Sequence, residues 1–536
     1  MRPASVVGSN STPNAPYIIA AYLAIAAFVL YPIASVTIPG LTDYPNHLAR
    51  MHILAAIDAS ADLRRYYELH WTPMPYLAMD AMVPLIARIM PIYDAGRVFI
   101  GLCLLLPVAG TAALHYAVHR RASLFPLIAF LFSYNYLLSW GFLNYLFSVS
   151  LCLFLLAAWV ATANWPRWLR AAAFSVPALI LYFSHIYGFV AYCLAVAGFE
   201  FGRAWRARFQ PIQTVAADWI AAAAQAVPAA IFLFTMDLSG ASAGPALEIT
   251  SYGGIDAKIL AIESPFIFVG GRAEFAIAAL ICAALIAGLL SGRLRLAPSI
   301  WPAAAAVAAV AIVTPQMLLN VFGVDFRLPL VVVLILISGI SIQLPHPRPL
   351  LFLLVLVPLI AIKVWLAATV LQALDRQFAD ARQVISHLPY GARVLPARID
   401  TRTNPLAFLP QRMTMHIGML AVIDRDAFAP LLFTGFTTVH THEALDNSGS
   451  PLVRPVPVRN LFSGLEMHDD LVTRDGVRGQ RNYWLDWEDK YNFVLLQHFG
   501  AGAGTLPENL TLIASSDTMN LYRINKLQYV SKRSPH

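Results

Sequence analysis

Residues 40–54, GLTDYPNHLARMHIL, hold an acid, two histidines and an arginine within a few helical turns. The carboxylate of Asp43 can act as a general base, and His47 and Arg50 can set its charge state or orient a substrate. A helical pattern begins at Pro45, so Asp43 also occupies the position of an N-cap in an amphipathic helix at a membrane surface. The sequence leaves the catalytic and the structural interpretation of Asp43 open.

The composition indicates which kind of protein must position these residues. Of 536 residues, 58% are hydrophobic and only 12% are charged, against about 25% charged in soluble domains. The net charge of +7 comes from short basic clusters between apolar runs, which indicates membrane topology rather than nucleic-acid binding. The four cysteines lie inside apolar runs and predict neither disulfides nor a metal site. We therefore expect a polytopic α-helical membrane protein.

About eleven apolar runs approach the roughly 20 residues that a spanning helix needs. They lie near 17–38, 95–118, 123–140, 141–163, 169–186, 187–202, 212–236, 273–291, 299–318, 326–344 and 349–371. Basic clusters follow the even-numbered runs, so the positive-inside rule predicts a cytoplasmic N terminus. This topology places 39–94, 237–272 and everything after 371 on the outer side.

The sequence predicts two regions, a transmembrane domain over 1–371 and a soluble α/β domain over 372–536. In the first outer loop, 39–94, the run 76–91 is short and interrupted by charge and proline, which favours an in-plane juxtamembrane helix. The second region is charged with both signs. It contains the strand-like ARVLPA and YNFVLLQHFG and the helical FADARQVISHL.

Further polar residues are predicted at the outer ends of the spans. Arg327 in GVDFRLP can hold an anion, with Asp325 as its partner, or can simply be an interfacial anchor. His185 and Tyr187 in FSHIYGF can line a cavity, although a histidine satisfied by a carbonyl is the structural alternative. Weaker candidates, each with a structural alternative, are Asn135, Asn144, Lys258, Arg272, the possible zinc pair His440 and His442, Asp469, Asp470 and the aromatic run 483–491.

A single aspartate after the first spanning helix, followed by a Pro-containing juxtamembrane segment, resembles the first outer loop of the GT-C superfamily of membrane glycosyltransferases. The Arg-containing, Pro-followed helix start at Arg327 also resembles helix starts late in such chains. The resemblance implies a polyprenyl-phosphate-linked sugar donor, with Asp43 as the base that deprotonates the acceptor. Because Asp-Tyr-Pro replaces a paired acidic motif, no divalent metal or other cofactor is expected.

The resulting expectation is an inverting glycosyltransferase at the outer face of a bacterial cytoplasmic (inner) membrane, with a periplasmic C-terminal domain. Its acceptor would be a lipid or cell-envelope glycan. Asp43 would be catalytic, and His47, Arg50, His185, Tyr187 and Arg327 would bind substrate. Two alternatives remain: a transporter or flippase of a lipid-linked glycan, and a membrane-anchored envelope assembly factor acting through 372–536. The hydropathy pattern lacks the inverted repeat typical of many transporters.

Overall fold

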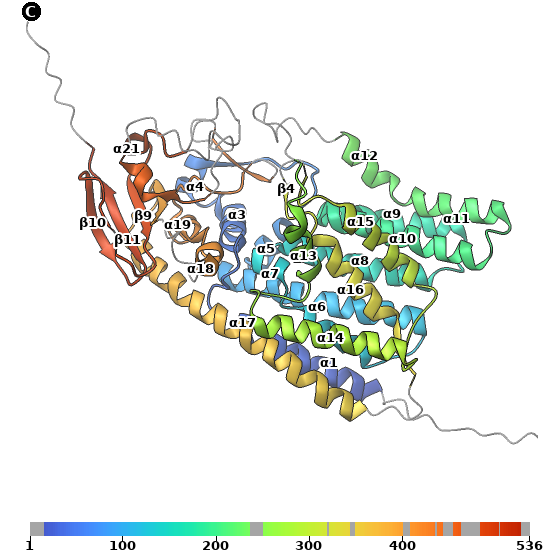
Figure 1. Ribbon diagram of the computed structural model, residues 1–536. Helices are drawn as coiled ribbons and strands as arrows, with labels where there is room; N and C mark the ends of the chain where they lie inside the picture. Colours follow the sequence, from blue (N-terminus) through green and yellow to red (C-terminus); the bar gives the residue numbers. More distant parts are fainter. Residues whose placement is uncertain are drawn as a thin grey trace, which may run out of the picture.

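The computed structural model describes residues 15–235, 250–318, 321–343, 349–399, 408–434, 437–442, 454–462, 483–502 and 504–526. Helices form one end of the molecule and a β-sheet region the other, and the long helix α17 connects them along one side (Figure 1). The protein is thus a helical membrane protein with a C-terminal sheet region.

The helical part contains many apolar helices. They are α1 (Ala15–Val29), α2 (Tyr31–Ala34), α6 (Ile92–His119), η1 (Phe125–Phe132), α7 (Tyr136–Trp140), α8 (Leu143–Ala161), α9 (Arg167–Ser184), α10 (Ile186–Arg206), α11 (Ile212–Ala224), α12 (Val227–Thr235), α13 (Gly254–Glu263), α14 (Arg272–Leu290), α15 (Trp301–Val313), α16 (Arg327–Gly339) and α17 (Pro349–Ile385). Two short antiparallel strand pairs lie between helices: β2 (Leu294–Leu296) with β5 (Ile340–Ile342), and β3 (Met317–Leu318) with β4 (Val321–Phe322).

Each of the eleven predicted apolar runs coincides with helical structure, but the helices differ in length. Among the described residues, five helices are long and apolar enough to cross a membrane, or six if α11 and α12, bent by 47°, form one span. The helices α15 and α16 have 13 residues each, about 20 Å, against about 30 Å of hydrocarbon. The predicted helices are therefore confirmed, and the number of eleven spans stays a prediction.

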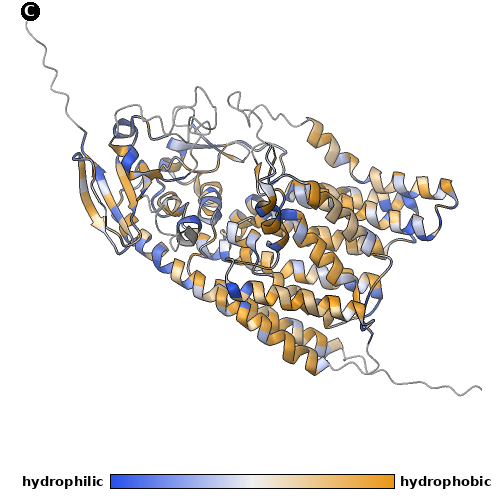
Figure 2. Ribbon diagram, in the orientation of Figure 1, coloured by the Kyte–Doolittle hydropathy of each residue, from blue (hydrophilic) through white to orange (hydrophobic). Residues whose placement is uncertain are grey.

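Hydrophobic residues cover α1, α14 and the first half of α17 on most sides (Figure 2). In α17 the exposed apolar side chains include Leu350, Leu354 and Trp365. Such continuous exposed apolar surface needs lipid rather than water around it.

The first outer loop folds into α3 (Tyr44–Ala56), α4 (Ala61–Tyr66), β1 (Tyr67–Leu69) and α5 (Ala78–Ile86). The helix α5, predicted as an in-plane element, has nine residues, about 14 Å, and is too short to span a bilayer. The helix α3 is not the amphipathic surface helix that the structural interpretation of Asp43 predicts. Its residues Tyr44 to Arg50 are buried apart from the half-buried His47, whereas Ala55, near its C-terminal end, is exposed.

The helix α17 has 37 residues, about 55 Å, and passes through residue 371 without a break. The predicted helix FADARQVISHL begins inside it. Oδ1 of Asp375 accepts hydrogen bonds from the backbone N–H groups of Thr37 and Ile38 at 3.1 and 2.9 Å. The C-terminal region therefore continues directly from the membrane part.

The C-terminal region contains a five-stranded mixed sheet among the described residues, in the order β10-β11-β9-β6-β8. The strands are β6 (Val394–Arg398), β8 (Val456–Pro457), β9 (Phe493–Gln497), β10 (Leu510–Ser515) and β11 (Met519–Ile524), and β6 is parallel to β8 and β9. The helical elements are α18 (Phe408–Met413), η4 (Ile417–Met419), α19 (Leu420–Arg425), η6 (Val458–Leu461) and α21 (Trp487–Lys490). The predicted strands ARVLPA and YNFVLLQHFG are confirmed as β6 and β9.

The C-terminal region also pairs with the first outer loop. Strand β7 (Val439–Thr441) is antiparallel to β1, with Glu68 opposite His440. The helix α19 packs against α3, on which the candidate site is built, and α17 packs against α19.

Candidate active site

Backbone hydrogen bonds fix the position of Asp43. The N–H of Asp43 donates to the carbonyl of Trp140 at 2.9 Å, and the N–H of Thr42 donates to the carbonyl of Ser139 at 3.0 Å. These carbonyls lie at the C-terminal end of α7, where intrahelical donors run out. The main chain at Asp43 is therefore held without any contribution from its carboxylate.

The carboxylate of Asp43 does not cap α3. The residue stands at the N-cap position, but its φ of −92° and ψ of −7° are helical, and among the described residues its side chain accepts no capping hydrogen bond. A capping aspartate normally has extended backbone and accepts from the second or third helical N–H. The prediction that the side chain of Asp43 caps the helix is therefore wrong. The carboxylate is free to make other contacts.

His416 of the C-terminal region is a titratable partner of Asp43. Its Nε2 lies 3.5 Å from Oδ1 of Asp43, and the two side chains are 1% and 15% exposed. Its Nδ1 lies 3.2 Å from Nδ2 of Asn46, whose other contact is the carbonyl of Leu431 at 2.6 Å. Because an amide nitrogen only donates, Nδ1 of His416 accepts, and in the neutral ring Nε2 carries the proton that faces Asp43.

Arg412 supplies positive charge beside Asp43. Its guanidinium lies over the rings of Tyr136 and Trp140, at 5.0 and 4.9 Å from their centroids, and Nη2 donates to Oγ of Ser139 at 3.0 Å. Its Nε and Nη1 are buried and find no hydrogen-bond acceptor in the part of the chain that the structure describes. Burial lowers the pKa of Arg412, and the charge of Asp43 acts in the opposite direction. Arg412 thus presents buried, unused donors next to a carboxylate.

Gly141 allows this close packing. It has a φ of +86°, and a Cβ at this position would lie 3.1 Å from the backbone nitrogens of Asp43 and Tyr44. Only glycine combines this left-handed backbone with the close approach of α3. The segment 136–142 therefore packs against Asp43 directly.

The same segment contacts Arg327 through Phe142. The guanidinium of Arg327 lies between the rings of Phe142 and Tyr187, at 4.6 and 4.8 Å from their centroids, and Nη1 donates to the carbonyl of Phe322 at 3.1 Å. Arg327 is only 6% exposed. It is therefore not an interfacial anchor whose side chain extends into water. Arg412 and Arg327 thus both lie against aromatic rings of the segment 136–142.

Asp325 is not the ion-pair partner of Arg327. Its Oδ2 lies 3.7 Å from Nζ of Lys258, and both of its carboxylate oxygens are buried without a hydrogen bond from any described residue. Lys258 also donates to the carbonyl of Thr314. Lys258 is therefore a structural partner of Asp325 rather than a solvated loop charge.

His185 and Tyr187 lie on the Arg327 side of the site. His185 ends α9 and begins α10, and its Nδ1 accepts from the backbone N–H of Tyr187 at 3.1 Å. Its ring lies 4.5 Å from that of Tyr76 and 5.2 Å from that of Tyr145. Asn144 fixes the 76–79 segment, because its side chain donates to the carbonyl of Tyr76 and accepts from the N–H of Met79. His185, Tyr187 and Arg327 are thus brought together.

Arg50 is engaged elsewhere. Its Nη2 lies 2.5 Å from Oδ2 of Asp80, with side-chain exposures of 5% and 0%, and Oγ1 of Thr438 donates to the other oxygen of Asp80 at 2.8 Å. A buried arginine with its own carboxylate is poorly placed to bind a second anion. The structure therefore joins Arg50 to Asp80 and not to the carboxylate of Asp43.

His47 faces the C-terminal region. Its ring lies edge-on to Phe433 at 5.5 Å, and Phe433 also contacts the ring of His416 at 5.0 Å. Burial, reinforced by the positive charge of Arg50, holds the pKa of His47 well below its usual value. His47 is consequently a neutral imidazole at pH 7 and adds no positive charge to the site.

The weaker candidates lie apart from this site or serve the fold. Asn135 caps α7, Arg272 is the exposed first residue of α14, and Tyr483, Trp484 and Trp487 are buried in the core. His442 contacts Glu68 and the carbonyl of Arg64, and within the described ranges no three His, Cys, Asp or Glu side chains are placed to share a metal ion. Asp469 and Asp470 lie outside the described residues.

Sequence reasoning missed Arg412, His416 and Asn46. The only local signal is QRMTMH at 411–416, where an arginine and a histidine are four residues apart before an apolar run. Their relation to Asp43 depends on the C-terminal region folding back onto α3. A linear sequence without homologues does not contain that information.

The chain matches no protein-family model and no curated protein. Among solved structures it is similar to ArnT from Cupriavidus metallidurans bound to undecaprenyl phosphate, with 11% identity and a TM-score of 0.49 over 95% of this chain and 98% of that chain. At that identity and TM-score, the similarity says nothing about the reaction that this chain catalyses.

Proposed function

We propose that the protein is a membrane glycosyltransferase that transfers a sugar from a polyprenyl-phosphate donor to a hydroxyl group, with Asp43 as the general base. The observation that carries the proposal is the carboxylate of Asp43, which does not cap α3 and lies 3.5 Å from His416, while Arg412 lies on the adjoining residues Tyr136, Ser139 and Trp140. A carboxylate held by its backbone, with polar neighbours and partial access to solvent, is suited to proton abstraction.

The two arginines support an anionic donor. Arg412 has buried donors that no described residue uses, and Arg327 is a buried guanidinium held chiefly by ring faces and a carbonyl. Burying a cation without a counter-ion is costly, so such sites favour an anionic ligand. A phosphate matches guanidinium geometry, and its charge grows as the glycosidic bond breaks.

The reaction is a single displacement. The carboxylate of Asp43 takes the proton of the acceptor hydroxyl, the acceptor oxygen bonds to the anomeric carbon, and the bond from that carbon to the phosphate oxygen breaks. The electron pair leaves with polyprenyl phosphate, whose charge Arg412 and Arg327 stabilise. One displacement inverts the anomeric configuration, and no step calls for a metal ion.

His185 and Tyr187 would contact the donor from the Arg327 side, whereas His47 and Arg50 would position α3 and bind substrate only indirectly. The acceptor would be a lipid or cell-envelope glycan. The site would face the outer side of a bacterial inner membrane, with the C-terminal region in the periplasm. This orientation follows from the basic clusters between the helices.

The decisive experiment measures release of polyprenyl phosphate from a panel of labelled lipid-linked sugars by the purified protein. We expect release by the wild type and a loss of about 100-fold or more in Asp43→Asn, the range typical of a removed general base. Asp58→Asn serves as the matched control, because Asp58 is an exposed acid just after α3.

Equal release by wild type and Asp43→Asn would refute the role of Asp43. Movement of an intact lipid-linked glycan across vesicles, with no bond cleaved from any donor, would instead establish the flippase alternative. Donor cleavage by the purified protein that is lost in Asp43→Asn would exclude an assembly factor that acts through the C-terminal region alone.

A further inference from the structure

A cavity of about 430 Å³ lies at the other end of α9 and α10 from His185. It is lined by the last turns of α10 and the first turns of α11, including Arg203, Arg206 and Trp219. Because α10 has 21 residues, about 30 Å separate this cavity from His185. It is therefore distinct from the candidate active site and lies at the opposite end of these helices.

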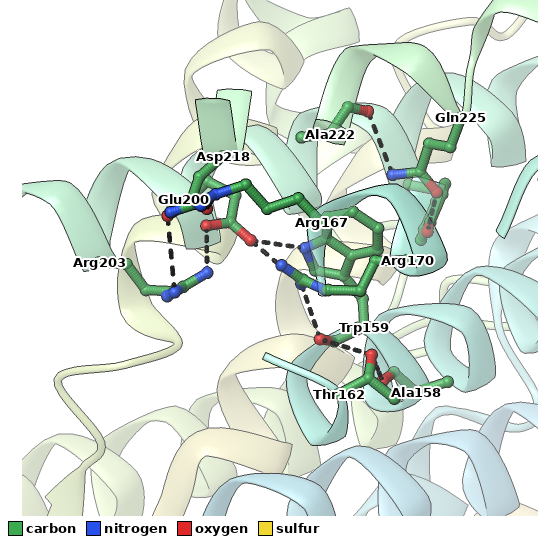
Figure 3. Close-up of polar contacts among 11 residues, drawn as sticks. Ala158, Trp159, Thr162, Arg167, Arg170, Glu200, Arg203, Asp218, Ala222 and Gln225 are labelled. Atoms are coloured by element: carbon green, nitrogen blue, oxygen red, sulfur yellow. Dashed lines mark hydrogen bonds and ion pairs between the residues drawn. The ribbon is translucent and has the colours of Figure 1, made fainter. Parts of the chain in front are cut away.

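Three residues that line the cavity, Glu200, Arg203 and Asp218, belong to a charged network (Figure 3). Glu200 accepts from Nε1 of Trp159 at 2.8 Å and from Nη2 of Arg170 at 3.2 Å on one oxygen, and from Nη1 of Arg203 at 2.7 Å on the other. Glu200 and Arg170 are 1% exposed as side chains. The carboxylate of Glu200 is thus fully satisfied and buried.

The second carboxylate of the network is also neutralised. Oδ1 of Asp218 accepts from Nε of Arg167 at 2.6 Å, and its Oδ2 lies 3.7 Å from Nη2 of Arg203 (Figure 3). Two carboxylates are therefore shared among three arginines, so the network already carries surplus positive charge.

Arg206 adds a further cation at the cavity wall. Its Nη1 donates to the carbonyl of Pro298 at 2.6 Å, and Arg206 and Arg203, three residues apart on α10, line the same cavity, where their like charges repel. None of the ion pairs found among the described residues includes Arg206. An anion in the cavity would relieve this repulsion, whereas a cation or neutral ligand would not.

Exposed tryptophans surround the same end of the helices. Trp165, Trp168 and Trp205 are 48%, 74% and 65% exposed. Tryptophan gathers at the level of lipid headgroups, where its ring is partly in hydrocarbon and its N–H in water. The cavity therefore opens at headgroup depth, next to surface that lipid covers.

We propose that this cavity binds the phosphate headgroup of an anionic phospholipid, with Arg206 as the principal ligand, the side chains of Gln210 and Thr214 as polar contacts, and Trp219 against the glycerol and upper acyl region. Basic pockets between membrane helices are suited to such headgroups. The bound lipid would hold α10 and α11 together, and this role is independent of Asp43.

The test compares full-length protein in nanodiscs of phosphatidylcholine alone and of phosphatidylcholine with phosphatidylglycerol. We expect phosphatidylglycerol to raise the Tm of the wild type and to stay bound when the protein is analysed by native mass spectrometry. In Arg206→Gln the apparent affinity should fall about fivefold, which corresponds to about 1 kcal/mol for one basic residue near an anionic lipid surface.

Arg208→Gln is the matched control, because Arg208 is an exposed arginine two residues away that does not line the cavity. The control should retain phosphatidylglycerol at the wild-type level. Equal losses in the two variants would overturn the proposal in favour of diffuse surface charge. Equal protection by inorganic phosphate in phosphatidylcholine discs would also overturn it, since the site would then bind a soluble anion rather than a lipid.

Discussion

Nε2 of His416 lies 3.5 Å from Oδ1 of Asp43, although one residue begins the first outer loop and the other belongs to the C-terminal region. At this separation the contact is electrostatic, because it exceeds an ordinary hydrogen bond. The C-terminal region therefore contributes a residue to the candidate active site.

His416→Ala tests this contact. Removing the N–H that faces Asp43 should lower kcat for polyprenyl phosphate release by about 10-fold, which corresponds to about 1.4 kcal/mol of lost electrostatic stabilisation. KM for the donor should change little, since His416 is directed at the base. His416→Gln keeps an amide donor and should recover part of kcat. A change in KM alone would place His416 on the donor instead.

Gly141→Ala tests the packing of segment 136–142 on Asp43. The new methyl group would meet the backbone of Asp43 and Tyr44, and the left-handed φ would add strain of about 1 kcal/mol. We expect donor release to fall by at least about 10-fold, measured as kcat/KM.

Gly254→Ala is the control for Gly141→Ala. Gly254 has a similar φ of +76°, but nothing lies within 4 Å of its missing Cβ. The activity of Gly254→Ala should stay near that of the wild type. Its Tm should fall about as much as the Tm of Gly141→Ala, because both substitutions strain a left-handed backbone. Equal losses of activity in both variants would mean that strain, not displacement of Asp43, is responsible.

The sequence predicted the parts of this molecule that depend on local pattern. Long apolar runs determine the helices, and short continuous apolar runs determine β6 and β9. Asp43, Arg327 and His185 stand out because polar residues are rare beside apolar runs. Arg412 and His416 do not stand out, since their role depends on contacts between distant segments. The prediction that Arg50 binds substrate did not foresee its ion pair for the same reason. Its carboxylate partner, Asp80, is 30 positions away and is brought close only by the packing of α5 on α3.

Arg412→Gln tests the anion site. Losing a guanidinium that is stacked on Tyr136 and Trp140 should raise the donor KM by about 10-fold or more, since charge-assisted hydrogen bonds contribute about 1.5–3 kcal/mol. Arg412→Lys should recover little, because an ammonium group cannot reproduce the planar stacking. Arg376→Gln, at an exposed position of α17, removes the same charge and should leave KM unchanged. A normal donor KM in Arg412→Gln would contradict the assignment.

Asp80→Asn tests whether Arg50 is structural. It would leave Arg50 buried without its counter-ion, at a cost of about 3–5 kcal/mol. We expect a clear fall in Tm, which is measured by thermal unfolding of the protein in detergent. The double variant Arg50→Met, Asp80→Leu should recover most of the stability, because both charges are removed together. Wild-type donor release in that double variant would exclude a direct role of Arg50 in binding substrate.

The depressed pKa of His47 predicts a pH dependence of stability. The folded protein holds His47 neutral, whereas the unfolded chain protonates it near its usual pKa of about 6.5. Stability from this source is complete above that pH and decreases as the pH falls below it, because the unfolded state then binds more protons. The Tm of the wild type should therefore drop between pH 7 and pH 5. His47→Gln should reduce that drop, and His387→Gln, at an exposed histidine, should leave it unchanged. An identical drop in all three proteins would show that protonation of His47 is not coupled to folding.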